Sequence, residues 1–207
     1  MKNDFMKELL LRHKLAMAPE SSAPPDYHHQ MVVYLGCADR RLKPEEHLKF
    51  QPGEAFYLRN PGALVHPQDE NIEVMVEALL ESPPHDKLKH LIISVHTDCL
   101  ILKACRDGCG DKISRRRYVK KHLNNVHHEV MKEAKTKGWG NDPAKVLKEL
   151  EKKSLLQSLA NLETLPVVQK AIVEGNLKIH GWLLDTHTRN IYAMNPDTQE
   201  FELWVII

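Results

Sequence analysis

The chain has 207 residues, of which 28% are charged and 42% apolar, the balance of a globular protein with a buried core. Its 29 Lys and Arg nearly cancel its 28 Asp and Glu, so no net charge favours binding to nucleic acid or to an anionic membrane. No apolar run reaches the roughly 18 to 20 residues that a membrane-spanning helix needs. The first eight residues carry charges where a secretory signal would be apolar, and we therefore expect a cytoplasmic protein.

The first 26 residues predict an N-terminal helical arm and linker. Apolar residues recur at roughly helical spacing between residues 4 and 16, and a Ser- and Pro-rich stretch follows at 21–26. We expect this arm to pack on the body of the protein or on a partner. Residues 27–207 are then expected to form one zinc-binding α/β catalytic domain, for the reasons that follow.

From residue 31 onward, predicted strands and helices alternate. Short apolar runs at 31–35, 55–58 and 91–95 are typical of strands buried on both faces of a parallel sheet. Apolar residues at helical spacing mark a helix at 72–80, which ends before Pro83. The alternation predicts an α/β fold with a mainly parallel central sheet flanked by helices.

The second half of the chain begins with a charged, mostly helical segment. This segment spans 114–158 and breaks at Gly138-Trp139-Gly140, after which Asp142-Pro143 is a favourable helix start. The remaining predicted elements are a short helix near 164–175, strands at 177–184, 190–194 and 201–207, and a hairpin turn at 186–190.

Two groups of reactive side chains directly follow two of the predicted strands. Cys37, Asp39 and Arg41 come after the first strand, and His96 and Cys99 come after the strand at 91–95. Ligands bind outside the carboxyl ends of strands in an open α/β sheet, so these side chains are expected to converge. A helix starting near His96 would place His96 and Cys99 on one face through their i, i+3 spacing. Two thiolates and one imidazole suit zinc and leave a fourth position open, which is the catalytic pattern.

Asp39 and Arg41 are the expected acid–base pair beside this metal. Asp39 lies two residues from a ligand, close enough to orient a water molecule or to take the fourth position itself. Arg41 is the expected counter-ion because a guanidinium pairs with both oxygens of a carboxylate. Arg40 is the competing candidate, but alternation along an extended segment places Asp39 and Arg41 on the same side. A single cysteine after a strand is usually only a buried apolar residue, so the metal interpretation depends on the whole combination.

Cys105 and Cys109 form a separate pair in a Gly-containing segment. They fit a redox pair, a second metal clip, or two small residues in a turn. Since no third ligand is obvious nearby, we favour the turn.

The combination of Cys-x-Asp-x-Arg and His-x-x-Cys resembles the β-class carbonic anhydrases. The segments 53–62 and 177–185 are similar to the family's Gly-acidic-x-x-x-x-Arg-Asn-x-Gly stretch and to its C-terminal strand. The resemblance implies Zn²⁺ held by Cys37, His96 and Cys99, with Asp39 and Arg41 as the catalytic residues. It implies reversible hydration of carbon dioxide to bicarbonate by zinc-bound hydroxide.

The resemblance also implies a homodimer or a larger homo-oligomer, with the N-terminal arm crossing to a neighbouring subunit. The expected partner is a small-molecule substrate, with no nucleic acid and no membrane. Residues at about 111–150 look like a helical insertion relative to the family.

Leu100 departs from the family pattern, which usually has glycine directly after the second cysteine. A leucine there adds apolar bulk that narrows the expected substrate pocket. Two alternatives stay open. Leu100 suggests hydrolysis of carbonyl sulfide or carbon disulfide on the same zinc site, and the charged helical insertion suggests a non-catalytic zinc-binding scaffold.

Overall fold

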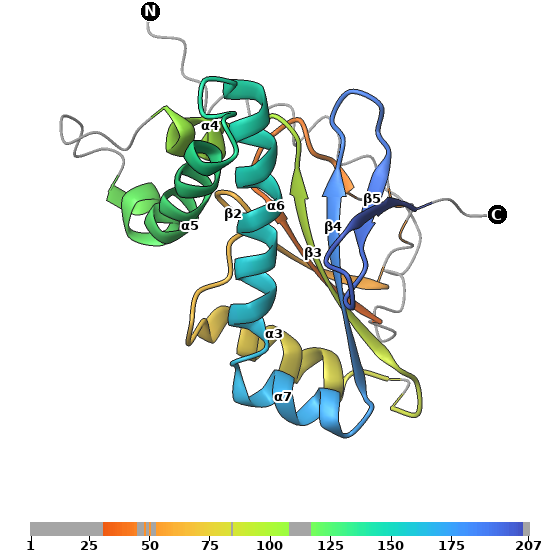
Figure 1. Ribbon diagram of the computed structural model, residues 1–207. Helices are drawn as coiled ribbons and strands as arrows, with labels where there is room; N and C mark the ends of the chain where they lie inside the picture. Colours follow the sequence, from red (N-terminus) through yellow and green to blue (C-terminus); the bar gives the residue numbers. More distant parts are fainter. Residues whose placement is uncertain are drawn as a thin grey trace, which may run out of the picture.

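A six-stranded sheet forms the centre of the computed structural model, which describes residues 31–44, 48, 50, 53–83, 85–107 and 117–204 (Figure 1). The strands run in the spatial order β2-β1-β3-β4-β5-β6. Their bounds are β1 (Val32–Cys37), β2 (Ala55–Asn60), β3 (Lys89–His96), β4 (Leu177–Leu184), β5 (Ile191–Met194) and β6 (Phe201–Leu203). The first four strands are parallel and the last two antiparallel, which confirms the predicted mainly parallel sheet.

The helices of the described residues connect and cover these strands. They are α3 (Glu70–Glu81), α4 (Leu100–Arg106), α5 (Arg117–Thr136), α6 (Pro143–Leu162) and α7 (Pro166–Val173). Helix α6 runs along β3 and β4, and α5 lies against α6 (Figure 1). As the sequence predicts, Asp142 caps α6 by accepting the amides of residues 144 and 145 at 3.0 Å.

The continuous apolar runs of β1 and β3 are buried on both sides of the sheet, as in other parallel sheets. Val33 and Leu35 point into the main core beneath the helices. Val32 and Tyr34 alternate with them and belong to a second apolar cluster on the opposite face. This two-sided burial holds the carboxyl ends of β1 and β3 in place, and the candidate site lies there.

Most predicted elements are present with small shifts at their ends. The helix break at 138–140 and the hairpin at 186–190 are confirmed. The predicted insertion at about 111–150 ends inside α6, which packs on the sheet through buried residues such as Leu150 and Leu155. That helix therefore belongs to the core layer. The predicted arm and linker at 1–26 lie outside the described residues.

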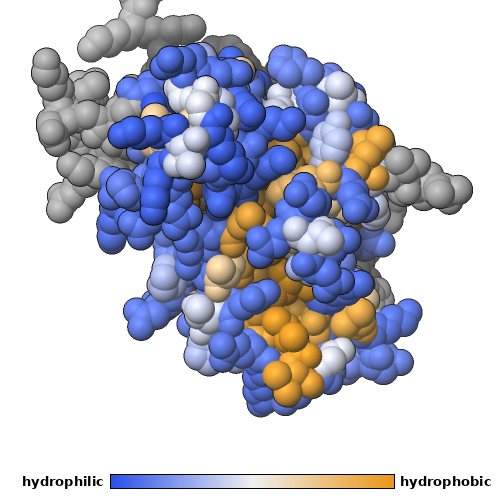
Figure 2. All heavy atoms as spheres, in the orientation of Figure 1, coloured by the Kyte–Doolittle hydropathy of each residue, from blue (hydrophilic) through white to orange (hydrophobic). Residues whose placement is uncertain are grey.

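The surface over α5 and α6 is mostly hydrophilic, whereas apolar side chains gather around α7 (Figure 2). Val173, at the end of α7, is 87% exposed, and Ile172 beside it is also exposed. Among the described residues, no helix has both the length and the apolar character required to cross a membrane.

Candidate metal centre

The ends of two neighbouring parallel strands bring the predicted ligands together. Cys37 is the last residue of β1 and His96 the last residue of β3, and these strands are hydrogen-bonded to each other. Cys99 follows three residues after His96. The ligand atoms of all three residues lie within 4.8 Å of one another, and all three side chains are buried. The predicted convergence is therefore present in the structure.

The local conformation that brings Cys99 back to His96 is a turn, so the expected helical spacing is wrong. His96 still pairs with Leu184 of β4, and the Thr97 amide donates to the Leu184 carbonyl at 2.9 Å. The chain then reverses at Asp98, which has a φ of 66°, and α4 begins only at Leu100. Because the β-ladder continues through His96, a helix cannot start there.

The geometry of the three side chains fits a zinc ion. The Cys37 and Cys99 sulfurs are 3.9 Å apart, close to the roughly 3.8 Å expected for two thiolates at about 2.3 Å from a tetrahedral zinc. His96 Nδ1 donates to the Thr97 carbonyl at 2.9 Å, which leaves Nε2 as an acceptor. His96 Nε2 is buried and has no hydrogen-bond partner within the described part of the chain. An unpaired buried acceptor costs about 1 to 3 kcal/mol, and a metal ion would satisfy it.

The two thiols also have the electrostatics of a metal-binding pair. A hydrogen bond with Cys99 lowers the pKa of Cys37 to about 4, against the opposing effect of burial. The same contact raises the pKa of Cys99. The Gly62 amide donates to Cys37 Sγ at 3.3 Å and further favours the thiolate. These hydrogen bonds thus favour the thiolate form of Cys37, which is the form that binds metal.

Asp39 and Arg41 form a two-pronged ion pair beside the three candidate ligands. Arg41 Nε donates to Asp39 Oδ1 at 3.0 Å, and Nη2 donates to Oδ2 at 2.8 Å. The hydrogen bonds from Arg41 are the main cause that lowers the pKa of Asp39 to about 2. Asp39 Oδ2 lies 3.9 Å from His96 Nε2, so the carboxylate borders the place where a metal would sit.

Asp39 and Arg41 are brought together by a turn, and not by the expected alternation along an extended segment. The amide of Leu42 donates to the Asp39 carbonyl at 3.1 Å, which closes a turn, so residues 39–41 are not an extended segment. Arg41 also donates to the carbonyl and carboxylate of Asp98, at 2.9 and 3.4 Å. Arg40, the competing candidate, is exposed at the rim of the same pocket.

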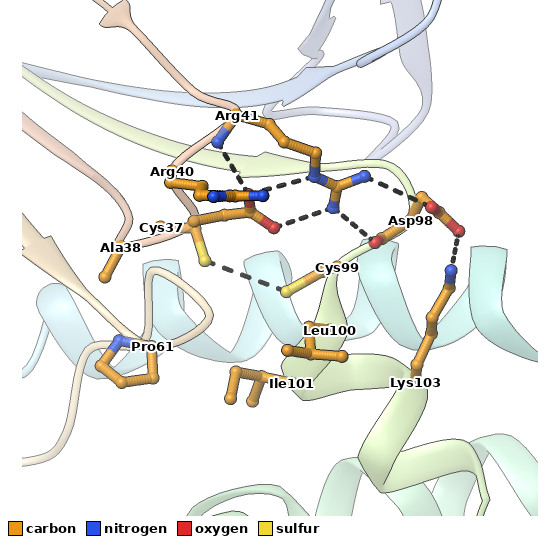
Figure 3. A pocket seen from close by; sticks show the side chains of 11 residues that line it. Cys37, Ala38, Arg40, Arg41, Pro61, Asp98, Cys99, Leu100, Ile101 and Lys103 are labelled. Atoms are coloured by element: carbon orange, nitrogen blue, oxygen red, sulfur yellow. Dashed lines mark hydrogen bonds and ion pairs between the residues drawn. The ribbon is translucent and has the colours of Figure 1, made fainter. Parts of the chain in front are cut away.

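A pocket of about 630 Å³ opens directly onto this group. Asp39 forms part of its wall. The wall also includes the two cysteines, apolar side chains and charged side chains, namely Cys37, Cys99, Ala38, Pro61, Leu100, Ile101, Arg40, Arg41, Asp98 and Lys103 (Figure 3). Leu100 lies at its edge with 70% of its surface exposed. The pocket wall is therefore partly apolar and partly charged.

Comparison with known proteins agrees with this arrangement. A family model described as carbonic anhydrase matches residues 32–191, which cover all three candidate ligands and the Asp39–Arg41 pair. The chain belongs to the β-carbonic anhydrase family. It is thereby a member of an enzyme family, and the predicted family is confirmed.

The relatives and solved structures are distant but cover most of the chain. A carbonic anhydrase of Pseudomonas aeruginosa is 25% identical over 180 residues, covering 82% of this chain and 76% of that protein. The mitochondrial β-carbonic anhydrase 6 of Arabidopsis thaliana is 29% identical over 156 residues, covering 72% and 51%. The structure of the β-carbonic anhydrase CcaA has a TM-score of 0.73 at 18% identity, covering 98% and 93%. One of two tetrameric β-carbonic anhydrases of Sordaria macrospora has a TM-score of 0.71 at 21% identity, covering 94% and 98%. At these identities the solved structures show the shared β-carbonic anhydrase fold.

Arg59 is a residue that sequence reasoning did not assign to the site. Its guanidinium donates to the carbonyls of Cys37, Asp39 and Leu42 at 2.8 to 3.1 Å. It therefore fixes the segment that carries both the candidate ligand Cys37 and the Asp39–Arg41 ion pair. The Arg-Asn-Pro-Gly stretch is recognisable as a family segment, but its contacts depend on β2 lying beside β1.

Glu151 is the second residue that the sequence did not single out. It lies on α6, is only 3% exposed, and its Oε1 accepts the Asp98 amide at 2.7 Å. Burial raises the pKa of Glu151 to about 7, while the amides of Asp98 and Cys99 act in the opposite direction. The charged pattern along α6 gives no signal that this one glutamate points inward.

The predicted turn at Cys105 is wrong, because Cys105 lies within α4 and is fully buried there. Its thiol faces the Leu123 carbonyl on α5. Cys109 lies outside the described residues, so a pairing of the two remains untested.

Proposed function

We propose that this protein catalyses the reversible hydration of carbon dioxide to bicarbonate with a zinc ion held by Cys37, His96 and Cys99. The observation that carries this proposal is the convergence of three buried donor atoms beside an ion-paired carboxylate, in a chain of the β-carbonic anhydrase family. Zinc bound there would lower the pKa of a coordinated water from about 15.7 to about 7, which supplies a nucleophile at neutral pH.

The protein side chains would position the reactants around this centre. The carboxylate of Asp39 would accept a hydrogen bond from the attacking water and orient it toward carbon dioxide. Arg41 holds both oxygens of Asp39, keeps the carboxylate ionised and restrains it from taking a metal position. The apolar wall formed by Pro61 and Ile101 would admit the linear, uncharged substrate.

The direct test is stopped-flow hydration of carbon dioxide by zinc-replete protein at pH 7 and pH 9. We expect a rate above buffer, and about a hundredfold loss in Asp39→Asn, because positioned acid–base groups typically contribute 10² to 10⁴. Asp197→Asn, a change at an exposed carboxylate in the β5–β6 turn, is the matched control and should keep the wild-type rate.

Two results would contradict the proposal. Absence of hydration above buffer at both pH values would exclude the activity; pH 9 is included in case Asp39 closes the site at neutral pH. Hydration that is unchanged in Asp39→Asn would remove the acid–base pair from the mechanism. With bound zinc but no hydration, the non-catalytic scaffold would become the better interpretation.

A second candidate is hydrolysis of carbonyl sulfide or carbon disulfide at the same centre. It is favoured by Leu100, an apolar side chain at the pocket edge. Sulfide release from either compound, measured against the carbon dioxide hydration rate of the same preparation, separates the two activities.

We also propose that the protein forms a homodimer or a larger homo-oligomer. The structurally similar Sordaria macrospora enzymes are tetrameric, and α7 of this chain presents exposed apolar side chains that a second copy would cover. Light scattering coupled to size-exclusion chromatography measures the mass directly, and a monomer at micromolar concentration would contradict this. The cytoplasmic location remains a prediction.

A further inference from the structure

Glu151 is a buried carboxylate at the metal centre that is neither a candidate ligand nor part of the pocket between Asp39 and Leu100. It projects from α6 and meets the ligand-bearing turn 53 residues away in sequence. Its Oε1 accepts the Asp98 amide at 2.7 Å, a short bond to a main-chain donor. This contact lies between the two ligands that the turn carries, His96 and Cys99.

The turn needs an external support, because its own conformation is unfavourable. Asp98 has a φ of 66°, in the left-handed region that residues other than glycine rarely adopt. Cys99 is the N-cap residue of α4 but makes no side-chain capping bond. Asp98 and Cys99, the two residues with these unfavourable features, are adjacent in the chain. The Glu151 carboxylate of α6 accepts a hydrogen bond from the Asp98 N–H at this point.

Helix α6, which carries Glu151, is held rigidly by its packing on the sheet. Its buried residues pack it against β3 and β4, and β3 is the strand that ends in His96. Through Glu151, the turn is therefore hydrogen-bonded to a helix that packs on the same sheet as Cys37 and His96. Arg41 and Lys103 also contact Asp98, through its carbonyl and its carboxylate, whereas Glu151 holds its N–H from the sheet-packed helix α6.

We propose that Glu151 is a positioning residue of the metal centre, which holds the His96–Cys99 turn so that Cys99 Sγ and His96 Nε2 converge on one ion. This inference rests on the proposed zinc site. It assigns to Glu151 no contact with substrate or metal, and its effect passes through the Asp98 amide.

The alternative is that Glu151 only stabilises the fold, and Ser158 supplies the comparison. Ser158 lies on the same helix, is 1% exposed, and accepts the Val65 amide at 3.2 Å. Both side chains thus join α6 to a loop through a main-chain N–H. Only Glu151 does so between two candidate ligands.

The experiment compares Glu151→Gln, Glu151→Leu and Ser158→Ala in the full chain. Zinc affinity is measured by competition with a chromophoric chelator, and ligand geometry by the visible spectrum of Co²⁺-substituted protein. Glu151→Gln keeps an acceptor oxygen and should stay within about threefold of the wild-type affinity. Glu151→Leu should bind zinc 10- to 100-fold more weakly and alter the Co²⁺ spectrum, as is typical for loss of a residue that orients a ligand. Ser158→Ala should be less stable but unchanged in both metal readouts.

Wild-type affinity and spectrum in folded Glu151→Leu would overturn the inference. If Glu151→Leu fails to fold, Glu151→Asp decides, since it withdraws the carboxylate by one methylene: weaker zinc binding supports the inference, and unchanged binding overturns it. Failure of the wild-type chain to bind either metal would instead overturn the proposed zinc centre, so the two failures are distinguishable.

Discussion

Leu100 is an exposed apolar residue at the edge of the pocket, next to the candidate ligand Cys99. It follows Cys99 directly, occupies the first position of α4 and lies at the edge of the pocket with 70% of its surface exposed. A side chain so exposed contributes little to core burial. Its effect therefore falls on the entrance of the pocket rather than on the stability of the fold.

Replacing Leu100 by glycine should change which substrate is turned over. We expect Leu100→Gly to raise carbon dioxide hydration and to lower sulfide release from carbon disulfide, each by several-fold, because the apolar edge is removed. A change of one apolar group is worth roughly 1 to 3 kcal/mol in discrimination. The measurement is the ratio of the two rates in the same preparation.

Leu88→Gly, at another exposed leucine outside the pocket, is the control for this change. Equal rates of both reactions in wild type and Leu100→Gly would show that Leu100 does not set specificity.

The candidate ligands could be predicted from sequence because each lies at or just after an apolar run that marks a strand. Cys37 and His96 need only the rule that parallel strands end at the same edge of a sheet. Arg59 and Glu151 could not be predicted in the same way. Their contacts are to main-chain atoms of distant segments. Because every residue has these main-chain atoms, residue types give no signal for such contacts.

Among the elements, β4 has residues that fit the helix on one of its faces and the adjacent strand β3. Gly181 lies under α6, where an added Cβ would come within 2.7 Å of Leu159 Cδ1, so a larger residue there would require the Leu159 side chain to shift. On the other face of β4, His180 Nε2 meets His90 Nδ1 of β3 at 3.0 Å. Apolar periodicity predicts the strand but not this pair, which exists only because β3 and β4 are adjacent.

The His90–His180 pair should make stability depend on pH. Burial is the main cause that lowers the pKa of His180 to about 4, with His90 and Lys178 adding to it. Since an unfolded histidine titrates near 6.5, stability is full above about pH 6.5 and falls as the pH drops toward 4. We expect a loss of about 1 to 3 kcal/mol over this range. Chemical denaturation between pH 7 and pH 5 measures the slope.

His180→Asn should flatten this slope because asparagine keeps a hydrogen-bonding group that does not titrate. The control is His187→Asn in the exposed β4–β5 hairpin, which should keep the wild-type slope. An identical slope in wild type and His180→Asn would assign the pH dependence to other groups.

For the whole molecule, the order β2-β1-β3-β4 decides where the site lies. The chain makes β1, crosses to β2 on one side, and then returns past β1 to make β3 on the other side. The carboxyl ends of β1 and β3 therefore meet at a point where the strand order reverses. The alternation of strands and helices predicts a parallel sheet, but the sequence carries no signal for the order of its strands.

Removing the metal should lower the thermal stability of the zinc-loaded protein. Zinc at 1,000 times its dissociation constant would contribute about 4 kcal/mol, because it binds only the folded chain. For a chain of this size, that corresponds to a fall in Tm of roughly 10 °C on chelation. Calorimetry with and without a chelator measures the difference.

Two cysteine variants separate the ligand role from general effects of thiol loss. Cys37→Ser should abolish the chelator-induced fall, whereas Cys105→Ser, at a buried cysteine of α4, should retain it. Equal chelator effects in wild type and Cys37→Ser would contradict the assignment of Cys37 as a ligand.

The adjacency of β1 and β3 would also determine when during folding a metal ion could bind to the candidate ligands. Cys37 and Cys99 are separated by 62 positions, and only the pairing of β1 with β3 brings them together. A bound ion would therefore stabilise the sheet after it has formed rather than nucleate its assembly, and it should slow unfolding while leaving the refolding rate unchanged.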